Sequence, residues 1–229
     1  YTGSMRGLES RDEDILNFIV RDYVRAASPV SSGKIFESGT TDASSATIRN
    51  VMLKLDEEGF LAKPHTSAGR APTDKAYRYF VDYLMQEKEP PRRERDNFED
   101  MFDRMEETHE EVFGGLARML ADHMGLFTAV ASFPRNAGKR RAMNYGLENV
   151  MREPEFEDRD LAGELAGLMD NLENSLEKYF EASDFGEPEV FIGEENPVRF
   201  AKSFSSISVK LHDSEAGECL IFSLGPKRL

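Results

Sequence analysis

Apolar residues near the start of the chain recur at the three- and four-residue spacing of an amphipathic helix. Ser10, followed three residues later by Glu13, is the pattern of a capping box, and it precedes this periodic stretch. The apolar positions that share one face are Ile15, Leu16, Ile19, Val20 and Tyr23. Their spacing predicts a helix over residues 11–26, which Pro29 brings to an end.

Three further helices and a short hairpin are predicted in the same part of the sequence. Ser, Thr and Gly residues at the right places supply the helix start and stop signals. The expected elements are helices from Ser31 or Ser32 to about residue 37, from Ser44 to Gly59, and from Thr73 onward, with a hairpin tip at residues 64–69. Three helices followed by a small hairpin is the winged helix-turn-helix arrangement.

A stiff, charged linker at residues 89–93 marks the expected domain boundary, because it contains two adjacent prolines among charged residues. Beyond it, apolar residues alternate in steps of four and three, which is the period of a coiled-coil seam. The seam comprises Phe98, Phe102, Met105, His109, Val112, Leu116, Met119 and His123. We expect a dimer contact from Phe98, Phe102, Met105, Val112, Leu116 and Met119. Packing against the chain's own second domain explains the seam equally well, and Gly114-Gly115 interrupts the helical pattern.

The rest of the chain combines helical and strand patterns. After Pro134 a basic loop is expected, with Lys139, Arg140 and Arg141, and then a helix over residues 158–182 with leucines on one face. Apolar stretches at residues 188–192, 204–211 and 219–224 predict strands, the last two joined as a hairpin. The chain is therefore predicted to be α+β. Its expected parts are an expression scar at residues 1–4, a winged helix-turn-helix domain at 5–88, a linker and long helix at 89–133, and an α+β domain at 134–229.

Charge is unevenly distributed along the 229 residues. Of the net charge of −14, residues 1–86 carry −1, from 11 basic and 12 acidic side chains, and residues 87–229 carry −13, from 18 and 31. The total argues against nucleic-acid binding unless the first part has a local basic face. Apolar runs are too short for a transmembrane helix, and no secretion signal is recognisable. The single cysteine, Cys219, points to a reducing cytoplasm.

The helix from Ser44 to Gly59 has the composition of a DNA-recognition helix. Its apolar residues fall on one face, whereas the opposite face is short-chained and polar and then cationic, with no acidic residue before Asp56. Small side chains let a helix approach base edges closely, arginine can bind guanine, and asparagine can bind adenine. An ordinary amphipathic helix with a solvated polar face is the simpler explanation of the same pattern.

The predicted hairpin tip adds hydroxyl groups, a glycine and an arginine that could enter a narrow minor groove. The alternative is a solvated turn in which Gly69 only provides a positive φ angle. The residues expected to contact DNA are Ser44, Ser45, Ala46, Thr47, Arg49, Asn50, Lys54, His65, Thr66, Ser67, Gly69, Arg70 and Lys75.

Two strings of residues carry a family resemblance. They are Ser44-Ser45-Ala46-Thr47-Ile48-Arg49-Asn50 and Pro64-His65-Thr66-Ser67-Ala68-Gly69-Arg70, followed by Pro72-Thr73-Asp74-Lys75 and Tyr77-Arg78. With their separation, these strings resemble the HrcA family of bacterial heat-shock transcription repressors. The resemblance is strong over residues 8–86. It recurs more weakly at residues 146–156, 192–196 and 224–228, which in the family belong to a GAF-like regulatory domain.

The resemblance implies a cytoplasmic repressor that binds double-stranded DNA at an inverted-repeat operator of the CIRCE type, upstream of chaperone genes. It also implies a homodimer, no cofactor, and a chaperonin of the GroE type that helps to keep the repressor active. Compared with the family, the stretch between Phe133 and Tyr145 is short and the chain stops at Leu229. We therefore expect an abbreviated or truncated member with a shortened GAF-like domain.

Other classes of function fit the sequence less well. The four histidines, His65, His109, His123 and His212, have no zinc-site spacing, and a single cysteine cannot form a thiolate pair. We therefore expect neither an enzyme nor a metal site. A winged helix that binds another protein is the second hypothesis. Bulky apolar residues on the outer helix face would favour it, and Leu53 is the only one there.

Overall fold

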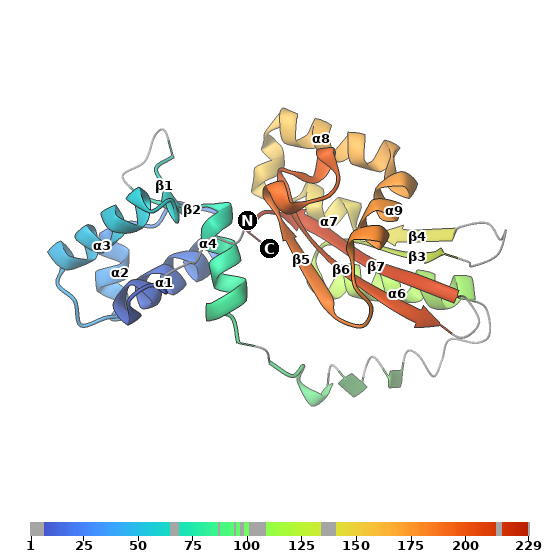
Figure 1. Cartoon of the computed structure of the whole chain (residues 1–229), viewed down its shortest axis with the longest axis horizontal. Helices are drawn as coiled ribbons and strands as arrows, with labels where there is room; N and C mark the ends of the chain where they lie inside the picture. The colour runs from blue at the N-terminus through green and yellow to red at the C-terminus, as the bar shows by residue number, and fades with distance from the viewer. Residues whose placement is uncertain are drawn as a thin grey trace. The chain divides into compact units, whose positions relative to one another are not determined.

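The structure is a computed structural model that describes residues 7–64, 69–86, 88–93, 95–96, 99–100, 109–133, 141–213 and 217–228. The fold is α+β, as the sequence predicts: helices dominate the N-terminal part, and a five-stranded antiparallel sheet forms the centre of the C-terminal part (Figure 1). The chain divides between residues 87 and 88 into two compact units. They are called the N-terminal and C-terminal units below. No described helix is long and apolar enough to cross a membrane.

The N-terminal unit contains helices followed by a small hairpin. Its elements are α1 (Ser10–Ala26), α2 (Ser32–Ser38), α3 (Ser45–Glu57), β1 (Leu61–Ala62), β2 (Ala71–Pro72), α4 (Asp74–Tyr79) and the π-helical turn η1 (Phe80–Leu84). The predicted caps at Ser31, Ser44 and Thr73 are confirmed, because each side chain accepts a hydrogen bond from a backbone N–H of the first turn of its helix.

The predicted capping box at the start of α1 is wrong. Glu9 is the N-cap residue and makes no side-chain cap hydrogen bond, and Ser10 is already helical. The Glu13 carboxylate instead accepts a hydrogen bond of 2.7 Å from the Tyr79 hydroxyl. The Glu13 carboxylate thus bonds Tyr79 of α4 instead of capping its own helix, and this hydrogen bond joins α1 to α4.

The hairpin is held against the connection between α1 and α2. Val30 and Arg70 exchange two backbone hydrogen bonds of 2.8 and 2.9 Å. Gly69 is buried, and a Cβ atom added to it would lie 2.9 Å from the backbone of Pro29. Its φ angle is not among the positive ones of the chain. The glycine is therefore explained by a close backbone approach and not by the positive φ that the sequence left as an alternative.

The C-terminal unit is built on a sheet in the order β4-β3-β7-β6-β5, in which every neighbouring pair is antiparallel. The strands are β3 (Phe127–Phe133), β4 (Arg141–Tyr145), β5 (Pro188–Ile192), β6 (Phe204–Asp213) and β7 (Gly217–Pro226). The helices are α6 (His109–Met124), α7 (Leu147–Met151), α8 (Arg159–Asp170) and α9 (Leu172–Ala182), with short 3-10 turns η2 (Pro154–Glu157), η3 (Gly193–Glu195) and η4 (Arg199–Ala201). The predicted α+β pattern and the final hairpin are confirmed.

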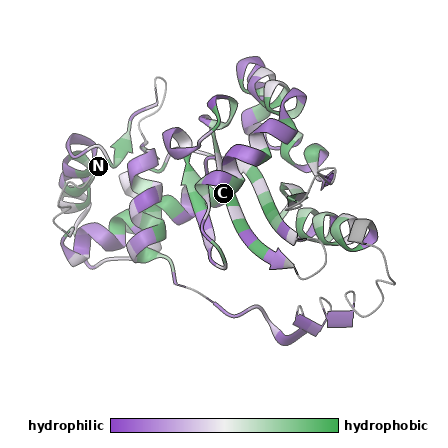
Figure 2. Ribbon diagram, turned by 45° about the vertical axis from the view of Figure 1, so that its right-hand side comes forward, coloured by the Kyte–Doolittle hydropathy of each residue, from purple (hydrophilic) through white to green (hydrophobic). Residues whose placement is uncertain are grey.

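The sheet carries helices on both faces, and each face has its own core (Figure 1). Phe127, Ala129 and Ala131 of β3 pack with residues from α7, α8 and α9, whereas Val130 packs with Phe113 and Ala117 of α6. This alternation follows from the two-residue period of a strand. Purple and green alternate along the helical ribbons, as expected for amphipathic helices that cover a sheet (Figure 2). Cys219 of β7 is buried in the α6-side core.

Two predictions for the C-terminal unit are corrected. The stretch expected to be a basic loop contains β4, an edge strand that pairs with β3. Its sequence does not show an apolar run, because Arg141 and Asn144 are polar and exposed. The predicted helix 158–182 is two helices, because the backbone leaves the helical conformation at Asn171 (φ −117°, ψ 24°). The predicted leucine face nevertheless packs inside the unit on both sides of this break.

The predicted coiled-coil seam is only partly described. Phe98, Phe102 and Met105 lie outside the described residues, as does the side chain of His109. Val112 and Leu116 are half-buried against the core cluster on the α6 side of the sheet, and Met119 is half-buried. Helix α6 runs without a break through Gly114-Gly115. Intrachain packing, one of the two explanations of the seam, therefore applies to Val112 and Leu116.

Gly69→Ala is predicted to destabilise the N-terminal unit by about 1–3 kcal/mol, because the added methyl group overlaps the Pro29 backbone and pushes the hairpin away. Urea unfolding of the variant measures this loss. Gly33→Ala is the matched control, because its Cβ atom would meet only the Ser31 hydroxyl at an ordinary 3.8 Å. Equal free energies of unfolding for the two variants would show that the close approach of Gly69 to Pro29 does not contribute to stability.

Candidate nucleic-acid interface

Helix α3 presents one buried face and one exposed face. Ile48, Val51, Met52 and Leu55 are buried, as the sequence predicts for the inner face. The exposed face holds Ala46, Arg49, Asn50 and Leu53, with Ser45, Thr47 and Lys54 half-exposed beside it. No acidic side chain precedes Asp56 on this helix. The outer face therefore offers small, amide and guanidinium groups to an approaching partner.

The start of α3 is closed by its own side chains. The Ser44 hydroxyl accepts a hydrogen bond of 3.2 Å from the Thr47 backbone N–H and lies 3.0 Å from the Thr47 hydroxyl. These contacts fix the first turn and orient both hydroxyls. A helix N-terminus favours an anion, and the first turn of α3 contains no acidic residue that would oppose one.

Arg49 is the exposed cation of the outer face. Its Nε atom donates a long hydrogen bond of 3.4 Å to the Ser32 hydroxyl at the start of α2. No carboxylate lies within ion-pair distance of its guanidinium in the described part of the chain. The Arg49 side chain is therefore steadied by α2, and its charge remains available to a ligand.

The other cations predicted to contact DNA have partners within the unit. Lys54 Nζ lies 2.7 Å from Asp12 Oδ2, and this hydrogen bond raises the pKa of Lys54, so that the ammonium stays charged. Arg70 Nε lies 2.8 Å from Asp56 Oδ2, and only 15% of the Arg70 side chain is exposed. Lys75 Nζ donates to the Glu58 carbonyl at 2.7 Å and lies over the ring of Phe60.

The predicted hairpin-tip residues are described only at their margins. His65, Thr66 and Ser67 lie outside the described residues, and Gly69 is buried against Pro29. Lys63 is exposed just before the tip. The structure thus brings Ser44 to Lys54 together on one helix, and it holds Arg70 and Lys75 at the base of the hairpin by internal contacts.

Sequence reasoning missed several features of this surface. Asp12 and Asp56 neutralise two of the predicted DNA-contacting cations, and Asp12 is 42 positions away from its partner Lys54. Phe36 of α2 is 53% exposed, near in value to the 51% of Leu53, whose place on the outer face of α3 the sequence does predict. The exposure of Phe36 carries no sequence signal, because α2 is too short for a reliable apolar period. Among the described residues, no group of three or more histidine, cysteine, aspartate or glutamate side chains gathers as a metal site would require.

Comparison with known proteins places the chain in a family. Residues 91–229 match the model of the HrcA protein C terminal domain. The chain is 49% identical over 94 residues to the heat-inducible transcription repressor HrcA of Chlorobium chlorochromatii, a match covering 41% of this chain and 27% of that protein. It is 53% identical over 78 residues to the same repressor of Prosthecochloris aestuarii, covering 34% and 22%. The matches thus span about a quarter of these relatives' length.

Comparison with solved structures supports the fold. The crystal structure of a protein described only as hypothetical superposes with a TM-score of 0.73 at 18% identity, over 97% of this chain and 92% of that one. At this identity the match shows a shared fold alone. An IclR family transcriptional regulator from Brucella abortus superposes with a TM-score of 0.27, at 16% identity over 99% of this chain and 86% of that one, too low to establish a common fold.

Arg49→Ala is predicted to weaken binding to an inverted-repeat duplex by about 1–3 kcal/mol, because a bidentate arginine contact to a guanine edge would be lost. Fluorescence anisotropy with that duplex and with a scrambled one measures the loss. Arg25→Ala is the matched control, because it removes the same charge from the exposed last turn of α1. The same loss on both duplexes would make Arg49 a phosphate contact, and an unchanged affinity would remove it from the interface.

Proposed function

Since the chain belongs to the HrcA family, we propose that it is a DNA-binding repressor of heat-shock genes that recognises an inverted-repeat operator of the CIRCE type as a dimer. In this proposal the N-terminal unit is a winged helix-turn-helix, with α3 as the recognition helix and the β1–β2 hairpin as the wing. The C-terminal unit is a shortened GAF-like regulatory domain. The protein acts in the cytoplasm without a cofactor, and a GroE-type chaperonin helps to keep it active.

The observation that carries the proposal is the outer face of α3. Apart from Leu53, its exposed side chains are small or able to read base edges, and no carboxylate interrupts them before Asp56. Arg49 has an uncompensated charge and Asn50 an exposed amide. A groove-facing helix needs this combination, since the phosphate contacts position the protein and the base contacts specify the sequence. Ser44, Ser45, Ala46 and Thr47 would approach the backbone and base edges at the helix start.

The hairpin supports the same proposal in a different way. Its base is fixed by the Val30–Arg70 bridge and by the close contact of Gly69 with Pro29. The base of the hairpin therefore has a defined position against Val30 and Pro29. Lys63 would contact phosphate on one side of the tip and Lys75 at its base. We propose that Arg70 acts mainly by holding the hairpin to Asp56 of α3 through their ion pair, and that its guanidinium also contributes positive charge to the DNA-binding surface.

A palindromic operator requires two modules, because one recognition helix reads few base pairs. We propose that the segment from Phe98 to Met119 joins them. Val112 and Leu116 would then contribute only the part of their surface that the α6-side core leaves exposed. The operator affinity would depend on this contact through the effective concentration of the second half-site.

The second candidate function is a protein-binding module. It is favoured by the exposed Phe36 and Leu53, which are the large apolar side chains on α2 and α3 that the unit leaves open. The outer face of α3 fits DNA better, because it lacks the aromatic residues that protein interfaces concentrate, and because Asn50 and Arg49 can read base edges.

Operator binding tests the proposal directly. The full chain is predicted to bind a labelled CIRCE-type inverted repeat more tightly than a scrambled duplex by about a thousandfold or more. Fluorescence anisotropy measures this ratio. A duplex with a single half-site should bind weakly, because the second module then has no partner site. Equal weak binding to all three duplexes would contradict sequence-specific recognition. The absence of binding at low salt would favour the protein-binding module.

The salt dependence of operator binding is predicted to be shallow for a repressor. Lys54 and Arg70 already have carboxylate partners, so that Arg49, Lys63 and Lys75 are the cations without a carboxylate partner that the described parts of α3, the hairpin and the start of α4 provide. Two modules would then release few counterions, and the slope of log K against log salt is expected to be no steeper than about −5. Asp56→Asn frees Arg70 and should steepen this slope by about one or two units for the dimer. A steep slope for the unchanged protein would mean that Lys54 and Arg70 leave their aspartates on binding.

A further inference from the structure

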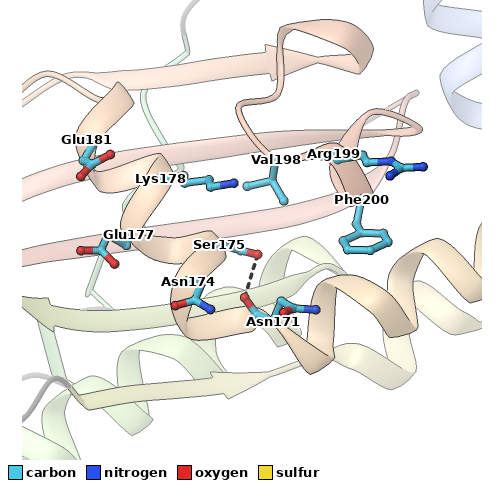
Figure 3. Close-up of a pocket in the computed structure, with 9 residues that line it drawn as sticks. All are labelled: Asn171, Asn174, Ser175, Glu177, Lys178, Glu181, Val198, Arg199 and Phe200. Carbon is cyan, nitrogen blue, oxygen red and sulfur yellow. Dashed lines mark hydrogen bonds between the residues drawn. The ribbon is translucent and has the colours of Figure 1, made fainter.

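The C-terminal unit contains a cavity of about 490 Å³ between α9 and the η4 turn (Figure 3). One wall is α9, with Asn174 and Lys178, and the other is the segment Val198–Phe200. In Figure 3, Lys178 reaches from α9 toward Val198, and the ring of Phe200 lies beside the α8–α9 junction. Glu177 and Glu181 lie at the opposite end of the cavity. The volume lies within the range of small-molecule sites, about 300–1,000 Å³.

The two walls are held together by a buried hydrogen-bond network. Asn196 Oδ1 accepts hydrogen bonds of 2.6 Å from the hydroxyls of Tyr179 on α9 and Ser206 on β6. Asn196 Nδ2 donates to the carbonyls of Gly193 and Phe204. Burial raises the pKa of Tyr179 far above its usual value, so that its hydroxyl remains a donor. The segment that leads into η4 is therefore tied to α9, and the width of the cavity is fixed by satisfied contacts.

The Phe200 ring is positioned by Gly167 of α8. A Cβ atom on Gly167 would lie 2.9 Å from two carbons of the ring, so that only glycine lets the ring come this close. Phe200 as a whole residue is 37% exposed although its ring rests on the helix. It therefore presents a fixed apolar surface to the solvent at the edge of the cavity, where a planar group could stack on it.

The cavity also gathers unpaired positive charge in a strongly acidic part of the chain. Among the lysines and arginines that the structure describes between residues 109 and 227, three have no ion pair, hydrogen bond or ring contact. They are Arg159, Lys178 and Arg199. Two of them line this cavity. The guanidinium of Arg199 points away from Lys178 in Figure 3, but it is exposed and loses no partner by turning toward the cavity.

We propose that this cavity binds a small aromatic anion of the aryl phosphate type. Its phosphate would lie between Lys178 and Arg199, and its ring would lie on Phe200. The Asn174 amide can donate a further hydrogen bond to the phosphate. Glu177 and Glu181 would repel the negative group from the other end and so fix the orientation of the ligand. This site is separate from α3, and the inference does not rest on DNA binding.

Isothermal titration of the full chain with phenyl phosphate tests the proposal, with inorganic phosphate and benzyl alcohol as partial probes. We expect saturable binding of phenyl phosphate with a dissociation constant below about 10 mM, at least about tenfold tighter than either partial probe. The ring and the charge each contribute to binding in this proposal. Equal binding of inorganic phosphate would remove Phe200 from the site, and no saturable binding of phenyl phosphate would overturn it.

Charge-removing variants locate the binding. Lys178→Gln and Arg199→Gln should each weaken phenyl phosphate binding about tenfold, and neither breaks a contact in the folded protein. Arg159→Gln is the matched control, because it removes the third unpaired cation, which lies at the start of α8 and does not line the cavity. An equal loss in the control would mean that the anion responds to the general charge of the unit, and this would overturn the assigned site.

Discussion

The candidate interface depends on the burial of one stripe of α3. Ile48, Val51, Met52 and Leu55 pack inside the N-terminal unit, and burying such side chains contributes about 1.5–3 kcal/mol each as an upper estimate. The Lys54–Asp12 and Arg70–Asp56 ion pairs beside them are partly buried, so that the cost of desolvating the charges offsets much of their attraction. The rotation of the helix about its axis is therefore set by its apolar face. Burial of the inner face turns the opposite face of α3 toward solvent, and Arg49 and Asn50 are exposed for that reason.

Internal ion pairs then decide how much positive charge that surface keeps. Asp12 is almost fully buried beside Lys54, and Asp56 holds Arg70. Each pair ties α3 to a neighbouring element, and each removes a charge from the surface that could attract DNA of any sequence. A recognition surface with few free cations depends more on base contacts than on phosphate contacts. The strong negative charge of the C-terminal unit acts in the same direction at low salt, although ions screen it beyond about 8 Å at physiological ionic strength.

The parts of the fold that could be predicted from sequence are those that local patterns determine. Ser31, Ser44 and Thr73 are helix caps that act on the next few residues, and the inner face of α3 follows from its period. The parts that could not be predicted depend on distant residues. Glu13 bonds Tyr79 instead of capping α1, and Gly69 is fixed by Pro29. Strand β4 is recognisable only through its pairing with β3, since its own residues alternate too weakly.

The two candidate sites are rigid for physical reasons, and this limits how a signal can act. The cap of α3 and the Tyr179–Asn196–Ser206 network beside the cavity each hold the backbone of their site in one arrangement, although the Arg199 side chain can turn. A ligand shifts an equilibrium only between states for which it has different affinities, so neither site alone forms a switch. Binding to a palindrome, in contrast, depends on the pairing of two modules. In the proposed function, a modest change in the dimer contact would alter the effective concentration of the second module, and with it the operator affinity, without any change in α3. The segment from Phe98 to Met119, proposed to join the modules, is therefore where regulation would have the greatest effect for the least structural change.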